Sequence, residues 1–162
     1  MKRNLTLISG ALFLGASAAS VAATAVDVWA TAVSTQAVTG RQVIFRFAKT
    51  FHQGFQTSDF PLRVILVWQY QSESGMPSTA EREDMDRMED LLQSYVGSSS
   101  ILALVSTGEN MREWVFYARS EEQFLMLLNM ALADAPHFPI EIHAAPDPDW
   151  FTYEGFRSGV IE

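Results

Sequence analysis

Residues 62–70 constrain the fold most, because this run is apolar on both faces of an extended chain. In a β-strand, successive side chains point to opposite faces of the sheet. The positions on one face are all large and apolar: Leu62, Val64, Leu66, Trp68 and Tyr70. Ile65 and Val67 make the other face apolar as well. A strand of this kind has to be covered on both sides, which predicts a central position in a sheet.

Two serines mark the starts of two predicted helices. Ser78 is followed three residues later by Glu81, which is the spacing of a capping box. Ser120 and Gln123 repeat that spacing. Apolar residues at helical spacing follow each serine. The sequence therefore predicts one helix from 78 to 97 and another from 120 to about 134.

The order of the segments predicts the fold class. Further β-prone runs lie at 101–105, 111–117 and 139–143. From Leu62 to His143 the order is then β-α-β-β-α-β, the pattern of a ferredoxin-like α+β sandwich. In that arrangement both helices cover one face of an antiparallel sheet.

Both ends of the chain add to this unit. Two β-prone runs, 27–33 and 41–47, predict an N-terminal β-hairpin that extends the sheet. Near the other end, Asp147 precedes Pro148, which predicts a capped start of a short C-terminal helix with proline in its first turn. Aromatic residues occupy one side of this predicted helix: Trp150, Tyr153 and Phe156.

Residues 1–25 differ from the rest of the chain. Two basic residues precede an uncharged stretch that extends to Val26 and ends in small residues. This is the pattern of a secretory signal peptide cleaved near Ala25. We therefore predict a single domain, residues 26–162, that is periplasmic or secreted and has no stable membrane insertion after cleavage. The alternative is a protein anchored by an uncleaved segment, since 18 or more uncharged residues can span a bilayer.

Composition narrows the classes of partner. The chain has a net charge of −8, and loss of Lys2 and Arg3 with the leader would make it −10. An acidic domain repels phosphate, so we predict no nucleic-acid partner. The chain has no cysteine, which excludes disulfides and a lipoprotein anchor. The 137 residues after the leader suffice for one hydrophobic core.

Catalytic and metal signals are weak. The chain has no cysteine nucleophile and no Gly-x-Ser-x-Gly elbow. Glu141 and His143 share one strand face, with Asp147 and Asp149 close behind, and one histidine with several oxygens can hold a divalent ion. A solvated strand shows the same alternation, and Asp147 already has a capping role. We predict no catalytic residues and no cofactor, and keep Glu141 and His143 as weak metal candidates.

Arg112 is a candidate binding residue. It shares a strand face with Trp114 and Phe116, while Glu113 points to the opposite face. Stacking on these aromatic rings, or an ion pair across the sheet, would account for an arginine at this position. The alternative is a clamp for the carboxylate of a ligand.

The first predicted helix is rich in acidic residues: Glu81, Glu83, Asp84, Asp86, Glu89 and Asp90. A solvated helix face accounts for such a run. A docking surface for a basic partner is the alternative.

Met126 and Met130 give the second helix an apolar feature away from its core side. At 100° per residue, Met126 lies about 160° and Met130 about 120° from Phe124, the centre of the predicted core stripe. Flexible methionine side chains suit adaptable protein contacts. Either these two residues meet a protein partner, or the C-terminal helix or the hairpin covers them within the chain.

Several segments together resemble a known family. They are Phe60-Pro61-Leu62, Trp68-Gln69-Tyr70, Gly75-Met76-Pro77, Met88-Glu89-Asp90, Arg112-Glu113-Trp114, Phe116-Tyr117 and Asp147-Pro148-Asp149-Trp150 with Tyr153. As a set they resemble domain-of-unknown-function family 695 over most of residues 27–157. That family is similar in fold to the B-type regulators of ribonuclease E, which act by binding a protein. The resemblance implies a ferredoxin-like fold and transfers no catalytic residues. Most members look cytoplasmic, so the leader is a departure.

From these features we predict a non-enzymatic, exported module that binds another protein or a second copy of itself. The alternative function is a small-molecule- or metal-dependent hydrolase with a site near Glu141 and His143. An open sheet face would favour binding, and an enclosed polar pocket with shifted pKa values would favour the enzyme.

Overall fold

The structure is a computed structural model that describes residues 5–8 and 25–161. Its elements are β1 (Leu5–Ile8), β2 (Val26–Thr35), β3 (Gln42–Phe51), a 3-10 turn (Thr57–Asp59), β4 (Leu62–Gln69), α1 (Thr79–Val96), β5 (Ser100–Gly108), β6 (Met111–Ala118), α2 (Glu121–Leu132), β7 (Ile140–Pro146), α3 (Phe151–Ser158) and β8 (Val160–Ile161). This is an α+β fold, as predicted.

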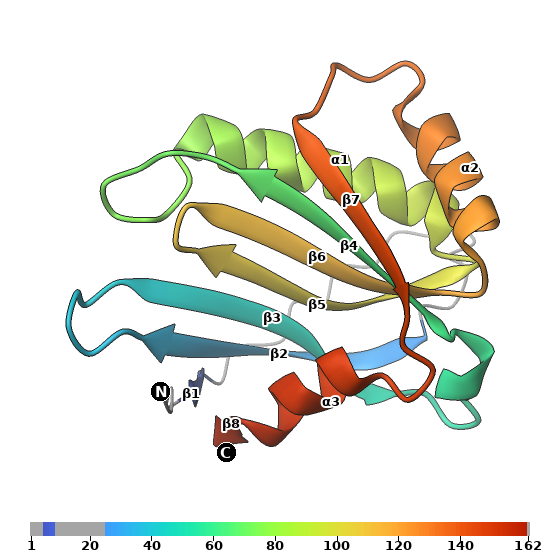
Figure 1. Ribbon diagram of the computed structural model, residues 1–162, viewed down its shortest axis with the longest axis horizontal. Helices are drawn as coiled ribbons and strands as arrows, with labels where there is room; N and C mark the ends of the chain where they lie inside the picture. The colour runs from blue at the N-terminus through green and yellow to red at the C-terminus, as the bar shows by residue number, and fades with distance from the viewer. Residues whose placement is uncertain (1–4, 9–24, 162) are drawn as a thin grey trace.

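One sheet organises the molecule (Figure 1). Its strand order is β7-β4-β6-β5-β3-β2-β1-β8. The six strands from β7 to β2 are paired antiparallel throughout. β4 pairs with β7 on one side and β6 on the other, so the doubly apolar segment is an interior strand, as predicted.

α1 and α2 cover one face of the sheet, as predicted for the two capped helices (Figure 1). Their core residues pack with Trp68, Trp114 and Phe116, all buried. At α1 the complete capping box forms, because Ser78 accepts from the Glu81 N–H and Glu81 accepts from the Ser78 N–H. At α2 the structure shows the Ser120 half of the predicted box.

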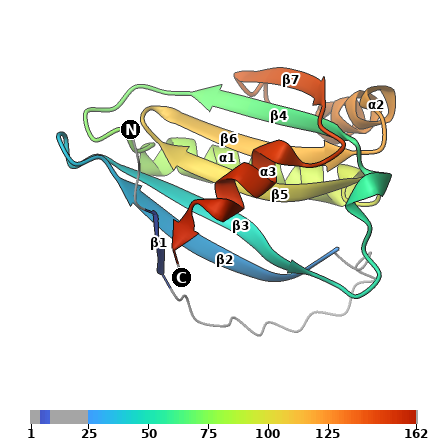
Figure 2. The same ribbon diagram turned by 60° about the horizontal axis from the view of Figure 1, so that its bottom comes forward.

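α3 lies on the opposite face, across β5 and β3 (Figure 2). Its predicted aromatic side faces the sheet, with Trp150 and Tyr153 buried and Phe156 partly buried. Trp150 stacks on Tyr117 of β6 with ring centroids 3.9 Å apart, and Phe156 contacts Phe45 and Phe47 of β3. A second core cluster therefore forms on this face, rich in aromatic side chains.

The predicted start of α3 was wrong in position. The helix begins at Phe151, and Pro148 lies in the turn before it. Asp147 still caps the helix, but it does so across the turn: its carboxylate accepts from the N–H groups of Phe151 (2.7 Å) and Thr152 (3.1 Å). The intervening turn places Trp150 in the left-handed region with φ 54°, which aims its ring into the core.

The N-terminal hairpin is confirmed and is longer than predicted, with β2 and β3 paired from Val26–Phe51 to Thr35–Gln42. β1 lies inside the predicted signal peptide and pairs with β2. The other residues of that leader up to position 24 lie outside the described part of the chain. Among the described residues, no helix combines the length and apolarity needed to cross a membrane.

Candidate functional site

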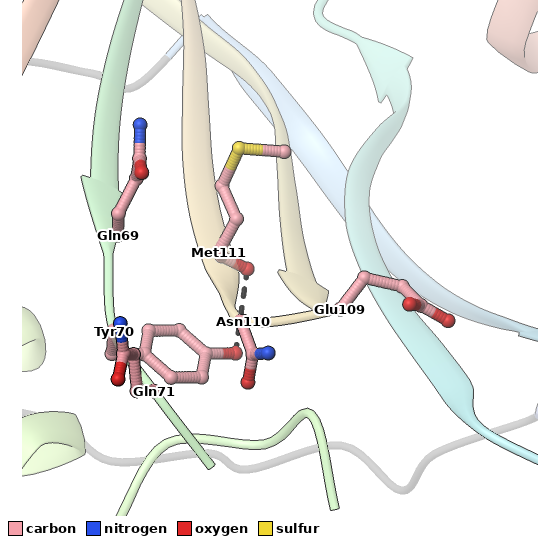
Figure 3. A pocket seen from close by; sticks show the side chains of 6 residues that line it. All are labelled: Gln69, Tyr70, Gln71, Glu109, Asn110 and Met111. Carbon is pink, nitrogen blue, oxygen red and sulfur yellow. Dashed lines mark hydrogen bonds between the residues drawn. The ribbon is translucent and has the colours of Figure 1, made fainter. Parts of the chain in front are cut away.

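A pocket of about 510 Å³ lies where β4 ends beside the turn between β5 and β6 (Figure 3). Six residues line it: Gln69, Tyr70, Gln71, Glu109, Asn110 and Met111. The lining therefore offers three carboxamides, one carboxylate, a thioether and a phenol. Such groups hydrogen-bond a polar ligand and supply no obvious nucleophile.

The turn that forms one wall has an unusual backbone. Glu109 and Asn110 both have positive φ, at 55° and 65°, as a two-residue hairpin turn of the right twist requires. Asparagine adopts this conformation readily, whereas glutamate does so at some cost. The hairpin thus holds the Glu109 carboxylate at the pocket in a conformation that the surrounding contacts must maintain.

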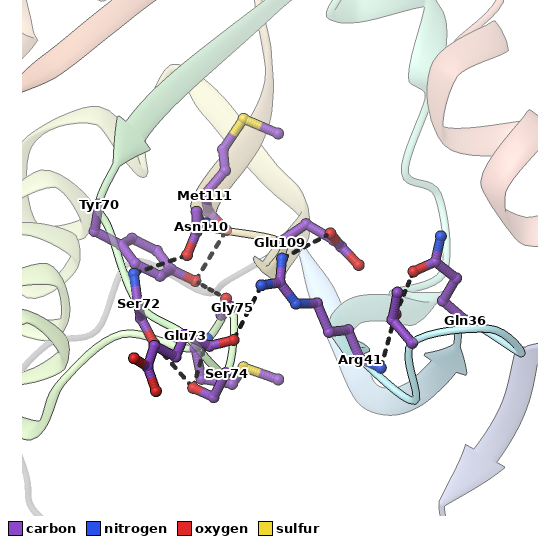
Figure 4. Close-up of polar contacts among 12 residues, drawn as sticks. Gln36, Arg41, Tyr70, Ser72, Glu73, Ser74, Gly75, Glu109, Asn110 and Met111 are labelled. Carbon is purple, nitrogen blue, oxygen red and sulfur yellow. Dashed lines mark hydrogen bonds and ion pairs between the residues drawn. The ribbon is translucent and has the colours of Figure 1, made fainter.

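Those contacts come from the loop after β4 (Figure 4). Asn110 donates its N–H to the Gly75 carbonyl and accepts the Tyr70 N–H on its own carbonyl, both at 3.0 Å. Its side-chain oxygen accepts the Ser72 N–H at 3.0 Å. Gly75 has φ 78°, and a Cβ there would lie 3.2 Å from the Glu109 nitrogen. Loop and turn are therefore fastened together in close contact.

Tyr70 lines the pocket and holds the neighbouring loop through its hydroxyl group. Its hydroxyl donates to the Gly75 carbonyl at 3.0 Å, with the Met111 carbonyl 3.4 Å away. Burial, followed by the nearby Glu81 carboxylate, raises the pKa of Tyr70 to about 12. The phenol is therefore a neutral hydrogen-bond donor at physiological pH and does not act as a base.

Arg41 connects the N-terminal hairpin to the rim of the pocket. Its guanidinium donates to the Glu73 carbonyl at 3.0 Å and lies 3.8 Å from the Glu109 carboxylate (Figure 4). These groups are partly exposed, so the pair contributes little energy and mainly fixes positions. Two parts of the chain thus line the pocket, and Arg41 from a third contacts its rim.

Arg112 follows Met111 in the chain but does not line this pocket. It pairs with Asp86 of α1 at 2.8 Å, and its guanidinium carbon lies 5.2 Å from the centre of the Trp114 ring. Stacking on the aromatic neighbour occurs, as one sequence interpretation expected. The ion pair is formed with a helix and not across the sheet, because α1 lies over this face of β6. The side chain is largely buried by these contacts.

Met126 and Met130 are both exposed on α2, each at 53%. The prediction that they point away from the core is confirmed. α3 lies on the opposite face of the sheet, and the hairpin lies beyond β5, so neither covers them in the described structure. Their binding role stays a prediction.

Glu141 and His143 are brought together on β7, with Nε2 of His143 3.6 Å from the Glu141 carboxylate. Gln69 of the pocket donates to Glu141 at 3.3 Å, so this pair adjoins the pocket rim. Asp147 does not join them, since it is buried and bonded to α3 and Tyr117. Within the described residues, no group of three or more potential ligands is placed to hold a metal ion.

Comparison with known proteins assigns the chain to a family. The model of the "Family of unknown function (DUF695)" matches residues 27–157. The chain belongs to this family. No curated protein and no solved structure gives a significant match to it.

The sequence analysis did not identify one buried carboxylate of this DUF695 domain. Glu89 of the acidic helix is buried and accepts a hydrogen bond from Trp114 Nε1 at 2.9 Å and another from Arg46 of β3. It is therefore not part of a solvated face. Its position was available in the sequence, because Glu89 falls at helical spacing between Met85 and Leu92, inside the core stripe.

Proposed function

We propose that this DUF695 domain is a non-enzymatic protein-binding or regulatory module. The observation that carries the proposal is the exposed pair Met126 and Met130, one turn apart on α2. Two exposed thioether side chains on one helix side form an adaptable apolar contact. Burying that surface against a partner contributes about 25 cal/mol per Å².

Strand order supports a ferredoxin-like assignment within this proposal. The order β7-β4-β6-β5, all antiparallel, with α1 and α2 on one face, is the arrangement expected of a β-α-β-β-α-β sandwich. β2, β3 and α3 would then be additions to that unit. Fold alone does not define function, so the binding proposal is based on the exposed surface.

Charge supports a protein partner with a neutral or basic surface. The net charge is −8, or −10 without the predicted leader. The electrostatic field of a protein with this negative charge speeds the approach of basic proteins and repels nucleic acid.

The test compares two surface variants. Met126→Glu/Met130→Glu should fold normally, since substitutions at exposed sites usually change stability within about ±0.5 kcal/mol. Phe151→Glu is the matched control, because Phe151 is exposed on α3 at the other face. Tagged wild-type protein and both variants are cross-linked in cells, and the attached proteins are identified.

The proposal is supported if a defined protein is recovered with the wild type and the Phe151 variant, is lost with the methionine variant, and binds the purified domain directly. It is rejected if the methionine variant retains every protein that the wild type captures.

The alternative, a hydrolase at Glu141 and His143, has one favourable observation, the 3.6 Å contact between them. Both side chains are about 60% exposed on a strand surface, whereas a general base works best in a site that excludes bulk water. Glu141→Gln should therefore leave partner binding intact. Hydrolysis of model ester or phosphate substrates that this substitution abolishes would favour the enzyme.

We also propose that the domain is exported and that residues 1 to about 25 are removed. Support comes from the uncharged, small-residue leader before Asp27. N-terminal sequencing of the protein from the periplasmic or secreted fraction tests this. An intact Met1 in the membrane pellet would establish the anchored alternative.

A further inference from the structure

We propose that two copies of this chain associate through β7, which joins their sheets edge to edge. This surface is separate from the methionine pair, so the inference goes beyond the proposed function. β7 is the terminal strand of the sheet, and within the described residues it pairs only with β4 (Figure 2).

β7 has few of the features that protect an edge strand. Its seven residues pair with β4 in one unbroken register, without a bulge. It contains no lysine, and its proline is the last residue. Natural proteins usually blunt such edges with charges, bulges or proline, because unpaired N–H and C=O groups template another strand. Here a regular edge is left available.

The outward hydrogen-bonding groups can be assigned from the ladder. Asp147 donates its N–H to the Pro61 carbonyl at 2.8 Å, in register with the β4–β7 pairs. Alternate residues of an antiparallel strand point their backbone groups to opposite sides. Glu141, His143 and Ala145 therefore bond towards β4, and the even-numbered residues point outwards.

Two of the outward residues carry a donor for a new strand. Ile142 and Ala144 present N–H groups, while the Ile140 N–H is used by the Phe138 carbonyl. Pro146 also points outwards, where its lack of an N–H costs no bond to β4. The outward carbonyls of Ile140 and Ile142 are the matching acceptors.

A twofold register centred on Ile142 uses all of these donors. Ile142 exchanges two hydrogen bonds with the partner's Ile142, and Ala144 donates to the partner's Ile140 carbonyl, twice by symmetry. Registers centred on His143 or on Ala144 give the same number of bonds, the second because the Ile142 N–H can donate to the outward carbonyl of the partner's Pro146. Hydrogen bonding alone therefore leaves three registers.

Side-chain pairing across the interface selects among them. Centred on Ile142, Glu141 lies opposite the partner's His143, and the reverse pair forms by symmetry. These are the close, non-hydrogen-bonded positions of the ladder. Glu141 already contacts His143 within its own strand. The four side chains of the dimer therefore form one cluster in which glutamate and histidine alternate. Centred on His143, the two histidines would oppose each other, and centred on Ala144, each His143 would oppose the partner's Ala145.

Apolar burial on the other face favours the same register. Ile142 is 39% exposed on the helix-covered face. The Ile142-centred register places it against the partner's Ile142, which removes both from water. The edge of this domain is therefore complementary to itself in backbone hydrogen bonds, in the Glu141–His143 pairs and in apolar contacts.

The first test measures self-association of the purified chain by sedimentation velocity over a range of concentrations. The wild type should form a dimer. His143→Glu should weaken it about tenfold or more, because each Glu141 would then face a carboxylate of the partner in place of an imidazole, and like charges directly opposite are destabilising. The swapped variant Glu141→Lys/His143→Glu should restore the dimer, since the charges oppose each other again. Both sites are exposed, and unchanged melting temperatures will confirm folding.

A second test reads the register directly. The chain has no cysteine, so Ile142→Cys introduces one thiol per copy. In the proposed dimer the two Cα atoms are about 5.5 Å apart, which suits a disulfide. Ile140→Cys is the control, because its twofold mate lies about 13 Å along the strand. Mild oxidation should cross-link the first variant and not the second.

Several results would overturn the proposal. They are a monomer at every concentration, a dimer that tolerates His143→Glu, failure of the swapped variant to recover association, or equal cross-linking at positions 140 and 142. A monomer that instead binds extended peptides along β7 would show that the edge serves a different occupant. Loss of the dimer leaves partner capture by the methionine surface unaffected, so the two proposals fail separately.

Discussion

The two faces of the sheet are covered in different ways. On one face, α1 and α2 are 18 and 12 residues long, and each begins with a serine cap. On the other face, α3 has 8 residues; its N-cap residue Trp150 makes no side-chain cap bond, and Asp147, ahead of the turn, caps the helix instead. An isolated helix of that length is not stable in water. α3 therefore exists because distant residues hold it.

The contacts that hold α3 come from several parts of the chain. Tyr153 donates to the Ala48 carbonyl, and Trp150 Nε1 lies within hydrogen-bond distance of the Thr57 and Phe60 carbonyls. Asp147 caps the first turn and accepts from the Tyr117 hydroxyl at 2.9 Å. Non-local contacts thus replace the local ones that stabilise α1.

Both faces nevertheless bury one carboxylate against an aromatic donor from the same strand, β6. Trp114 donates to Glu89 on the helix-covered face, and Tyr117 donates to Asp147 on the α3 face. A buried carboxylate that loses such partners is costly. β6 therefore positions a helix on each side of the sheet through a hydrogen bond as well as through packing.

The largest predicted effect distinguishes loss of stability in the whole domain from local unfolding of α3. Trp114→Ala and Trp150→Ala should each cost about 3–5 kcal/mol, the usual range for a buried tryptophan. Both rings are almost fully buried. Because α3 depends on Trp150, that variant should first release α3, whereas the Trp114 variant should lower the stability of the whole domain. Native-state hydrogen exchange distinguishes the two.

Protected backbone amides in α3 of the Trp150 variant would contradict this difference. Equal loss of protection throughout both variants would show that the two faces unfold as one unit.

Asp147→Ala should cost less, about 2–3 kcal/mol, because three donors lose a charged acceptor. Burial alone would raise the pKa of Asp147, but the hydrogen bonds from Thr152, Tyr117 and Phe151 outweigh it, and the pKa lies below its ordinary value. Its stabilising contribution is therefore full above the unfolded-state pKa of about 3.9 and is lost as pH falls through the lower folded-state value.

Chemical denaturation between pH 2 and pH 7 measures this effect. The difference between wild type and the Asp147 variant should shrink below about pH 4. Asp149→Ala is the control, since Asp149 is exposed in the same turn and should change stability by no more than about 0.5 kcal/mol. A difference that is constant with pH would show that the carboxylate's charge is unimportant.

The same contrast explains what the sequence could predict. Periodicity and caps are local, so the doubly apolar β4 and the start of α1 were placed correctly. The start of α3 depends on a turn whose conformation is fixed by burial of Trp150, and sequence spacing alone moved it to Pro148. The pocket joins the end of β4 to the turn at Asn110, with Arg41 and the loop at Gly75 in supporting contacts, and no sequence motif links these segments. Glu89 was misjudged because its charge was given more weight than its place in the stripe.

Ser78→Ala should have the smallest of these effects, about 1 kcal/mol, because it removes one partner of the capping box at α1. Ser94→Ala is the matched control. Ser94 is exposed within the same helix, its hydroxyl donates to a carbonyl one turn back, and alanine is the better helix former. Urea denaturation of both variants measures the difference. A cost near zero for Ser78→Ala would mean that α1, like α3, is fixed by its tertiary contacts, and the contrast between the two faces would then be one of length alone.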